Sequence, residues 1–248
     1  MGGAPARAEI VERPIAYESD GTACEGWLTY DDAVEGARPG VLIVHQWQGL
    51  TDYEKMRARM LAEMGYRVFA ADVYGKGVRP EETKECAVQS GKYKSDRKLY
   101  RQRLNDALKI LEKQPGVDRD RLAAIGYCFG GTGVLELARS GAPVLGVVSF
   151  HGGLDSPDPK AGKKIRGRVL ALHGADDPYV GREGIDAFEA EMEAAGVDYQ
   201  LVEYPGAVHS FTQKDAGNDP SQGRAYNAEA DAQSWAAMKA FLAEIFQN

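Results

Sequence analysis

The feature that most constrains this chain is a glycine-framed turn around Cys128, in the segment Gly126-Tyr127-Cys128-Phe129-Gly130-Gly131. The apolar run 122–125 before the turn predicts a buried strand, and residues 132–139 after it predict a helix. A sharp strand-to-helix turn leaves no space for side chains two positions either side of its apex, which explains both flanking glycines. The segment therefore predicts an α/β fold with Cys128 raised into the open.

A cysteine at the apex of such a turn has the surroundings of a reactive thiol. The N-terminus of the following helix directs backbone N–H groups and positive potential at the side chain, and this lowers the pKa of a thiol. The same N–H groups can stabilise an oxyanion at an attacked carbonyl carbon. The alternative is a small buried cysteine that only packs in a glycine-rich turn. The hexapeptide favours a nucleophile and leaves this alternative open.

Two later segments offer the partners that a nucleophile at this position needs. One predicted strand leads into a turn that contains Asp176 and Asp177, and another leads into a loop that contains His209. The order of nucleophile, acid and histidine, each just after a predicted strand, is that of a hydrolase triad. We assign Cys128, Asp177 and His209 to this triad. Asp177 is preferred over Asp176 because the proline after it favours an extended backbone.

The remaining sequence alternates predicted strands and helices. Residues 8–30 predict an antiparallel hairpin that turns at Asp20-Gly21. Beyond the hairpin, strands are predicted at 41–44, 67–71, 122–125, 143–150, 168–172 and 199–204, and helices at 53–64, 80–90, 95–114, 132–139, 185–195 and 225–246. This alternation predicts a mostly parallel sheet with helices on both faces and ligands at the carboxyl ends of the strands. We expect one domain over residues 1–248, with residues 1–7 flexible.

Four segments together resemble the dienelactone hydrolase family of α/β-hydrolases. They are the cysteine turn, His-Gly-Ala-Asp-Asp-Pro-Tyr-Val at 173–180, Ala-Val-His-Ser-Phe at 207–211 and His-Gln-Trp-Gln-Gly-Leu-Thr-Asp-Tyr at 45–53. The resemblance implies an α/β-hydrolase fold in which Cys128 is the nucleophile, Asp177 orients the imidazole and His209 is the acid and base. It also implies that the backbone N–H groups of Trp47 and Phe129 form the oxyanion hole.

These residues together predict a hydrolase of small carboxylic esters or lactones that works through a thioester acyl-enzyme. Two alternatives come from other classes of protein. The first is a non-catalytic binding protein with the same fold, and the second is a thiol-based redox protein that uses Cys128. The redox alternative lacks a second cysteine nearby in the sequence. The chain carries no motif for a redox or phosphate cofactor, so we expect no cofactor.

The chain departs from the pattern of this family at three positions. Gln46 stands where the family usually carries a glutamate that contacts the resting thiol, and this supports the binding-protein alternative. If the protein is an enzyme, a neutral residue at position 46 predicts a thiol that rests as a thiolate and reacts without substrate. Lys76 and Gln213 stand where the family carries two arginines that bind a substrate carboxylate. Simple esters or lactones are therefore better candidates than carboxylated lactones.

Side chains at the predicted strand ends give a candidate list of substrate-binding residues. The list has one cation among polar and aromatic groups: Gln46, Gln48, Tyr74, Lys76, His151 and Tyr179. Such a lining favours a small oxygenated acyl group over a long fatty chain.

The charge and apolar runs of the chain limit its partners. A formal net charge of −7 does not suit a nucleic-acid partner, because phosphate binding needs a basic surface. No apolar run approaches the roughly 18 residues of a membrane span. Residues 1–6 lack the apolar core of a signal peptide, so we expect a cytoplasmic protein, with secretion through a signal absent from this sequence as the alternative. We expect a monomer or a weak homodimer that acts on a small molecule.

The cysteines and histidines do not have the spacing of a metal site. The four histidines lie in separate segments without a helical pair four residues apart, so we expect no metal. The other two cysteines are Cys24, in a predicted strand, and Cys86, on a charged helix. We expect Cys24 to serve packing, and the sequence assigns no role to Cys86. A reactive Cys128 should stay unpaired, which suits a reducing compartment.

Overall fold

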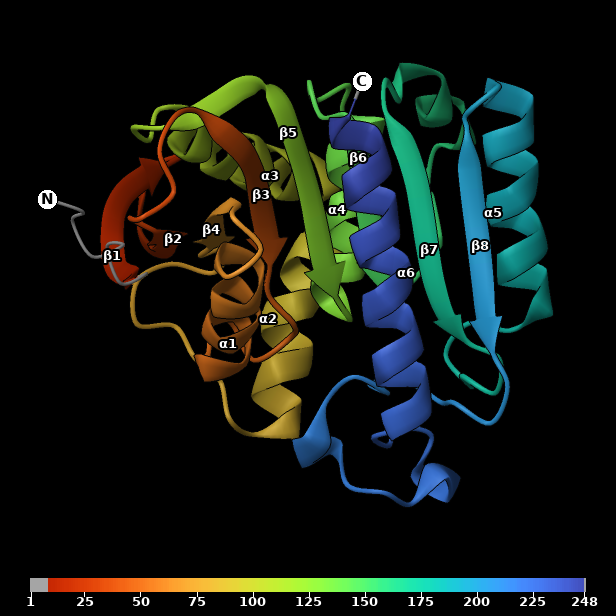
Figure 1. Cartoon of the computed structure of the whole chain (residues 1–248). Helices are drawn as coiled ribbons and strands as arrows, with labels where there is room; N and C mark the ends of the chain where they lie inside the picture. Colours follow the sequence, from red (N-terminus) through yellow and green to blue (C-terminus); the bar gives the residue numbers. More distant parts are fainter. Residues whose placement is uncertain (1–8, 248) are drawn as a thin grey trace, which may run out of the picture.

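The computed structural model describes residues 9–247, and Figure 1 shows their arrangement. The expectation of a flexible segment over residues 1–7 lies outside the described residues. None of the helices between residues 9 and 247 combines the length and apolar character of a membrane-spanning segment.

Eight strands form one sheet in the order β1-β2-β4-β3-β5-β6-β7-β8. Their bounds are β1 Ile10–Ser19, β2 Thr22–Asp31, β3 Arg38–Val44, β4 Arg67–Ala71, β5 Val117–Tyr127, β6 Gly146–Phe150, β7 Arg168–Gly174 and β8 Tyr199–Tyr204. The hairpin of β1 and β2 joins β4 in antiparallel fashion, whereas the strands from β4 across to β8 are parallel. The loops after β3, β5, β6, β7 and β8 therefore leave the sheet at the same edge.

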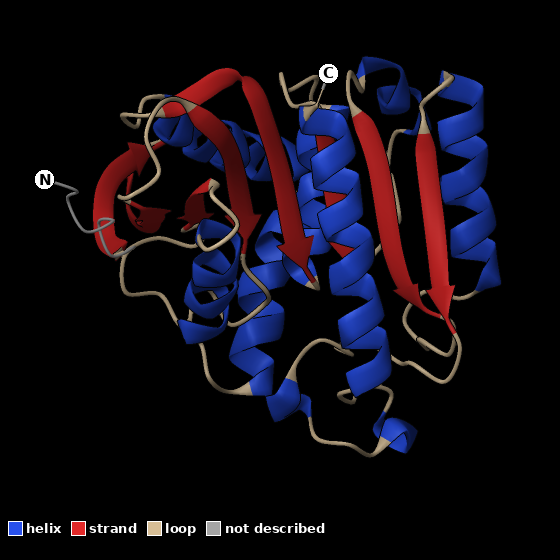
Figure 2. Ribbon diagram, viewed as in Figure 1, coloured by secondary structure: helices blue, strands red, loops and turns tan. Residues whose placement is uncertain are grey.

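Helices cover both faces of the sheet, as Figure 2 shows. Their bounds are α1 Asp52–Ala62, α2 Thr83–Ser95, α3 Arg97–Glu112, α4 Phe129–Arg139, α5 Arg182–Ala195 and α6 Ala228–Phe246. Alternate residues of β3 divide between two cores: Val41 and Ile43 pack with α1 and α6, while Leu42 and Val44 pack with α3, α4 and α5. This period-two division is the pattern of a sheet buried on both faces, and it confirms the predicted mostly parallel α/β sheet.

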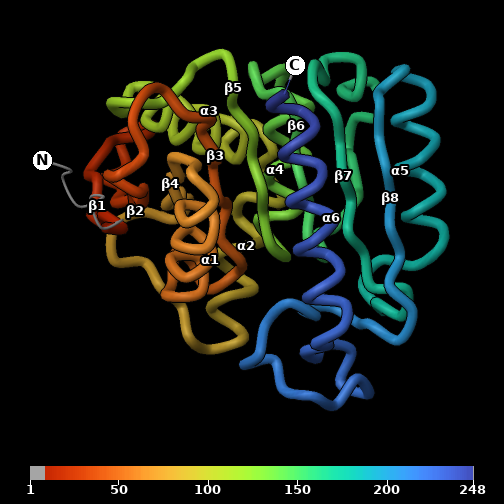
Figure 3. The backbone as a smooth tube through the Cα atoms, viewed as in Figure 1, coloured from red at the N-terminus to blue at the C-terminus, as the bar shows by residue number. Residues whose placement is uncertain are grey.

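Some predicted boundaries differ from those observed. Helix α4 begins at Phe129, directly after the cysteine, although its first turn contains two glycines that made a later start at residue 132 the prediction. The helix predicted at 80–90 runs over Thr83–Ser95. The long connection between β8 and α6 is visible as a separate loop in Figure 3, and it contains two short 3₁₀ helices, Lys214–Ala216 and Pro220–Gln222.

Candidate active site

The turn at Cys128 has the backbone geometry that its glycines predict. Cys128 has a φ of 52°, a region that residues with a side chain rarely occupy. A Cβ atom on Gly126 would lie 2.0 Å from the carbonyl oxygen of Gly130, and one on Gly130 would lie 2.1 Å from the carbonyl oxygen of Val44. Both glycines are therefore required by close contacts of the backbone.

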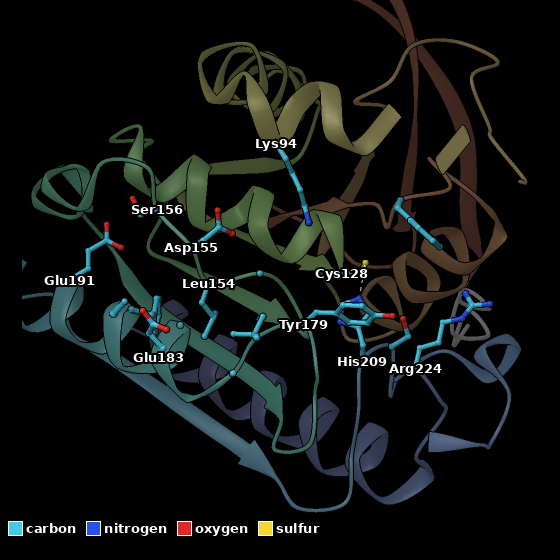
Figure 4. A pocket seen from close by; sticks show the side chains of 18 of the residues that line it. Lys94, Cys128, Leu154, Asp155, Ser156, Tyr179, Glu183, Glu191, His209 and Arg224 are labelled. Carbon is cyan, nitrogen blue, oxygen red and sulfur yellow. Dashed lines mark hydrogen bonds between the residues drawn. The ribbon is translucent and has the colours of Figure 1, made fainter. Parts of the chain in front are cut away.

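Three side chains from separate loops meet at this turn. The Nε2 atom of His209 lies 3.0 Å from the Sγ atom of Cys128, and its Nδ1 atom lies 2.9 Å from Oδ2 of Asp177. The other carboxylate oxygen, Oδ1, accepts a hydrogen bond from the backbone N–H of Tyr179 at 2.9 Å. Figure 4 shows Cys128 and His209 facing each other across the drawn hydrogen bond. The side chains thus form a continuous line from carboxylate to imidazole to sulfur.

The thiol and the imidazole shift each other's pKa in opposite directions. Burial raises the pKa of the Cys128 thiol, but the charge of His209 and its hydrogen bond outweigh burial, so this pKa lies below its ordinary value. Burial also lowers the pKa of His209, yet the Cys128 thiolate and the hydrogen bond to Asp177 raise it to about 10. Each group therefore favours the charged form of the other, and the two titrate as one unit.

The loop between β3 and α1 is held by hydrogen bonds along its length. Glu54, completely buried, accepts one from the backbone N–H of Gln46 at 3.2 Å and another from that of Thr51 at 2.8 Å. The hydroxyl of Tyr74 donates to the carbonyl oxygen of Trp47 at 3.0 Å. These contacts fix the segment that carries Trp47 beside the cavity of Cys128.

His151 lies behind the thiol and joins two parts of the site. Its Nδ1 atom accepts a hydrogen bond from the backbone N–H of Cys128 at 3.2 Å, so its Nε2 atom carries the proton that reaches the hydroxyl of Thr212 at 2.8 Å. Burial holds the pKa of His151 well below its usual range, so the ring is neutral. His151 therefore connects the turn of the cysteine with the loop of His209.

Unusual backbone conformations gather at this edge of the sheet. Among the described residues, four non-glycine residues have a positive φ, and three of them are Cys128, His151 and Ser210. The fourth, Asp20, is in the turn of the β1–β2 hairpin. Strained residues of this kind persist where their surroundings hold them, and functional sites are where they concentrate.

A cavity of about 920 Å³ contains the thiol of Cys128 and the imidazole of His209. Its walls come from α2, from α5 and from the loops after β3, β6, β7 and β8. Figure 4 shows Cys128, His209 and Tyr179 at one part of the cavity, and Glu191 far from them. Within residues 9–247, no group of three His, Cys, Asp or Glu side chains is placed to hold a metal ion.

Comparison with known proteins identifies one family for this chain. A family model described as the dienelactone hydrolase family matches residues 25–246. The chain belongs to the dienelactone hydrolase family. It therefore has the α/β-hydrolase fold and is a hydrolase that acts on esters or lactones.

Three similar proteins illustrate the family likeness. The solved structure named m3DLH has 42% sequence identity and a TM-score of 0.92, covering 96% of this chain and 99% of that one. A dienelactone hydrolase-like promiscuous phosphotriesterase, P91, from metagenomic libraries has 40% identity and a TM-score of 0.91 over the same shares. A protein of Saccharolobus solfataricus named "Putative carboxymethylenebutenolidase" is 28% identical over 95% of this chain and 99% of its own length.

Of the six substrate-binding residues predicted from the sequence, only Tyr179 is among the residues that line the cavity of this dienelactone hydrolase family member. His151 and Tyr74 are buried and bonded to other parts of the protein. Gln46 is also buried, and its amide Nε2 donates to Oε1 of Gln48 at 3.0 Å. These four side chains lie outside the cavity lining, behind the thiol or beside the loop between β3 and α1.

Lys76 was predicted to bind substrate, but the structure places its side chain elsewhere. Its Nζ atom lies 2.7 Å from Oε2 of Glu25 on β2, outside the cavity. Gln213, the other position at which the resemblance implied a carboxylate-binding arginine in the family, is buried and also lies outside the cavity lining. The cations that do line the cavity are Lys94 of α2 and Arg224 of the loop before α6, and the charge of Lys94 helps to lower the pKa of Cys128.

Sequence reasoning missed Lys94 and Arg224 for different reasons. A helix over the site was predicted, but with an end at residue 90, so Lys94 fell outside it. Arg224 follows His209 by a long loop, and an isolated bridge between these two residues returns it to the site. No local sequence pattern marks that return.

Proposed function

We propose that this protein hydrolyses carboxylic esters or lactones through a triad of Cys128, His209 and Asp177 and a thioester acyl-enzyme. The observation that carries the proposal is the pairing of thiol and imidazole at 3.0 Å, with the carboxylate at 2.9 Å from the far side of the same ring. A thiolate held at a helix N-terminus inside a cavity is suited to attack a carbonyl carbon.

The first half of the reaction forms the thioester. The Cys128 thiolate attacks the carbonyl carbon, and the negative charge moves to the carbonyl oxygen. The backbone N–H groups of Phe129 and Trp47 bind this oxyanion in the proposal. When the oxyanion collapses, the bond to the alcohol oxygen breaks, and the imidazolium of His209 gives its proton to the departing alkoxide.

The second half releases the acid and restores the resting pair. His209, now neutral, removes a proton from a water molecule as that water attacks the thioester carbonyl. Collapse of the second oxyanion breaks the bond between carbon and sulfur. The carboxylic acid leaves, Cys128 is again a thiolate, and His209 is again an imidazolium. Asp177 holds the ring in the required orientation and favours its charged form.

The non-catalytic alternative has less support than the enzyme. Its basis was Gln46, but the loss of a glutamate there removes none of the three side chains of the proposed triad. The redox alternative needs a second thiol, and Cys24 and Cys86 are both buried in the packing of their own elements.

The decisive experiment is turnover of p-nitrophenyl acetate by Cys128→Ala, His209→Ala and the double variant. Each single variant should lose at least about a thousandfold in kcat, and the double variant should lose little more, because the two groups act as one unit. Circular dichroism and thermal melting check that each variant remains folded. Wild-type turnover in a folded Cys128→Ala variant would remove the cysteine from the mechanism.

A further inference from the structure

The cavity is much larger than a small ester needs. Its volume of about 920 Å³ is near the upper end of the range for sites that enclose drug-sized molecules. Part of it surrounds Cys128 and His209, and the rest extends toward α5 and Glu191. The reaction described above uses only the first part.

The second part of the cavity has mainly apolar walls, and we call it the apolar arm. Its apolar lining consists of Leu154, Pro159, Val180, Ala187 and Phe188. These residues come from the loop after β6, from a 3₁₀ helix at Pro159–Lys164, from the loop after β7 and from α5. Figure 4 shows Leu154 on the side of Cys128 away from Arg224.

Of the three acids that line the cavity, Asp155 and Glu191 are paired with arginines of the protein, and Glu183 is exposed to solvent. Arg139, completely buried on α4, binds both carboxylate oxygens of Glu191 at 3.1 and 2.6 Å. It also donates to the carbonyl oxygens of Leu154 and Asp155, each at 3.1 Å. The Asp155 carboxylate lies 2.5 Å from Arg97. This network ties the wall to the nucleophile's helix and neutralises two of the acids, so an apolar occupant loses little by displacing water there.

The position of the leaving group decides which part of an ester enters the apolar arm. His209 protonates the leaving alkoxide in the proposed reaction, and its ring contacts Tyr179 at 5.2 Å between centroids. The backbone of Arg224 pairs with that of His209 in an isolated parallel β-bridge. The alcohol part therefore lies beside Tyr179 and Arg224, and the acyl chain points toward Leu154.

We infer that the apolar arm binds the acyl chain of the substrate, and that the natural substrates are esters or lactones with an extended apolar acyl group. This inference rests on the proposed function and names its substrate class. It replaces the expectation of a small oxygenated acyl group, which depended on six residues of which only Tyr179 lines the cavity. Because burial of one methylene group contributes about 0.8 kcal/mol, each added methylene should raise kcat/KM about fourfold while the arm fills.

The test compares p-nitrophenyl acetate, butanoate and hexanoate in the wild type, Ala187→Trp and Ala190→Trp. Ala187 lies on α5 and lines the arm, so an indole there occupies its space. Ala190 is an exposed alanine of the same helix that does not line the cavity, and it serves as the matched control. We expect kcat/KM to rise about 200-fold over the four added methylenes from acetate to hexanoate, in the wild type and in Ala190→Trp. In Ala187→Trp the ratio of hexanoate to acetate should fall at least tenfold.

The outcomes separate this inference from the proposed function. Turnover of acetate that depends on Cys128, without a rise along the acyl series, overturns the apolar arm and leaves the hydrolase intact. An equal loss for acetate and hexanoate in Ala187→Trp also overturns it. If hexyl acetate, with its chain on the alcohol, is the ester that Ala187→Trp selectively impairs, the assignment of the acyl chain is wrong. Absence of any acetate turnover in the wild type contradicts the proposed function itself.

Discussion

Two imidazole rings lie next to each other at the carboxyl edge of the sheet, and their pKa values are shifted in opposite directions. The rings of His209 and His151 lie 5.4 Å apart between centroids, at an angle of 68°. The pKa of His209 is raised to about 10, while that of His151 lies well below its usual range. Burial lowers the pKa of both rings. The difference therefore comes from what each ring contacts.

The contacts of the two rings explain the difference. His209 lies between a carboxylate and a thiolate, and both favour a positive ring. His151 lies between a backbone N–H group and a hydroxyl, and the positive charge of His209 further lowers its pKa. One ring is thus equipped to move protons, and the other to hold the backbone in place. The comparison teaches that the charge of a buried histidine depends on its partners more than on its depth.

Replacing Asp177 by asparagine should reduce the pKa difference between the two histidines, and we expect it to cause the largest loss of kcat. Without the carboxylate, the pKa of His209 falls toward that of His151, and a neutral ring no longer stabilises the Cys128 thiolate. We expect kcat for p-nitrophenyl acetate to fall by about 10³–10⁴-fold. The rate of alkylation by iodoacetamide at pH 7 should also fall, and its pH profile should move to higher pH, because the pKa of the thiol rises.

The matched control for this prediction is Asp176→Asn. Asp176 is exposed, and no hydrogen bond joins its side chain to His209 in the described structure. This variant should keep kcat and the alkylation profile close to those of the wild type. A larger loss in Asp176→Asn than in Asp177→Asn would move the third member of the triad by one residue.

Replacing His151 by alanine should test the positioning role of this second ring, and we expect a smaller loss of kcat. The variant loses the hydrogen bond to the backbone of Cys128 and the link to Thr212, so kcat should fall by about tenfold with KM little changed. The alkylation profile should keep its position on the pH scale, because His151 is neutral and contributes no charge.

Asparagine at position 151 provides the rescue. Its side-chain oxygen can accept from the N–H of Cys128, and asparagine tolerates the positive φ of 40° at this position. His151→Asn should therefore recover most of the lost kcat. A loss of kcat that follows only the melting temperature across the two variants, or a shift of the alkylation profile by a full pH unit, contradicts the positioning role.

Introducing a charge at position 46 should give the smallest effect. In Gln46→Glu, a carboxylate replaces the amide on the loop between β3 and α1 and opposes the thiolate, which raises the pKa of Cys128. Alkylation at pH 7 should slow severalfold, and its pH profile should move to higher pH. Gln46→Met, a neutral change of similar size, should leave the profile in place. Identical profiles in all three proteins would show that residue 46 does not act on the thiol.

The fold and the proposed triad could be predicted because their signals are local in the sequence. Gly126 and Gly130 are required by close backbone contacts at one turn, and the central strands β3, β5 and β7 contain apolar runs. Asp177 follows β7 and His209 follows β8, and parallel strands bring their carboxyl ends together. Order along the chain was therefore enough to place these side chains at one edge.

The cavity lining could not be predicted in the same way, because it depends on where side chains point. Lys76 follows a strand as expected, yet it pairs with Glu25 of the neighbouring hairpin. His151 also follows a strand, but its left-handed backbone directs the ring behind the cysteine. Phe188 and Arg224 reach the cavity from a helix face and a long returning loop. None of these directions is encoded in a short motif.

The wall that α5 gives to the cavity has a consequence for how such proteins diversify. Ile185 and Met192 are buried and hold this helix on the sheet, while Glu183 and Ala187 are exposed at the cavity. Exchanges at exposed helix positions usually change stability by less than about 0.5 kcal/mol. New substrate preferences can therefore arise by single exchanges on one helix, while the reacting groups, on other loops, are inherited unaltered.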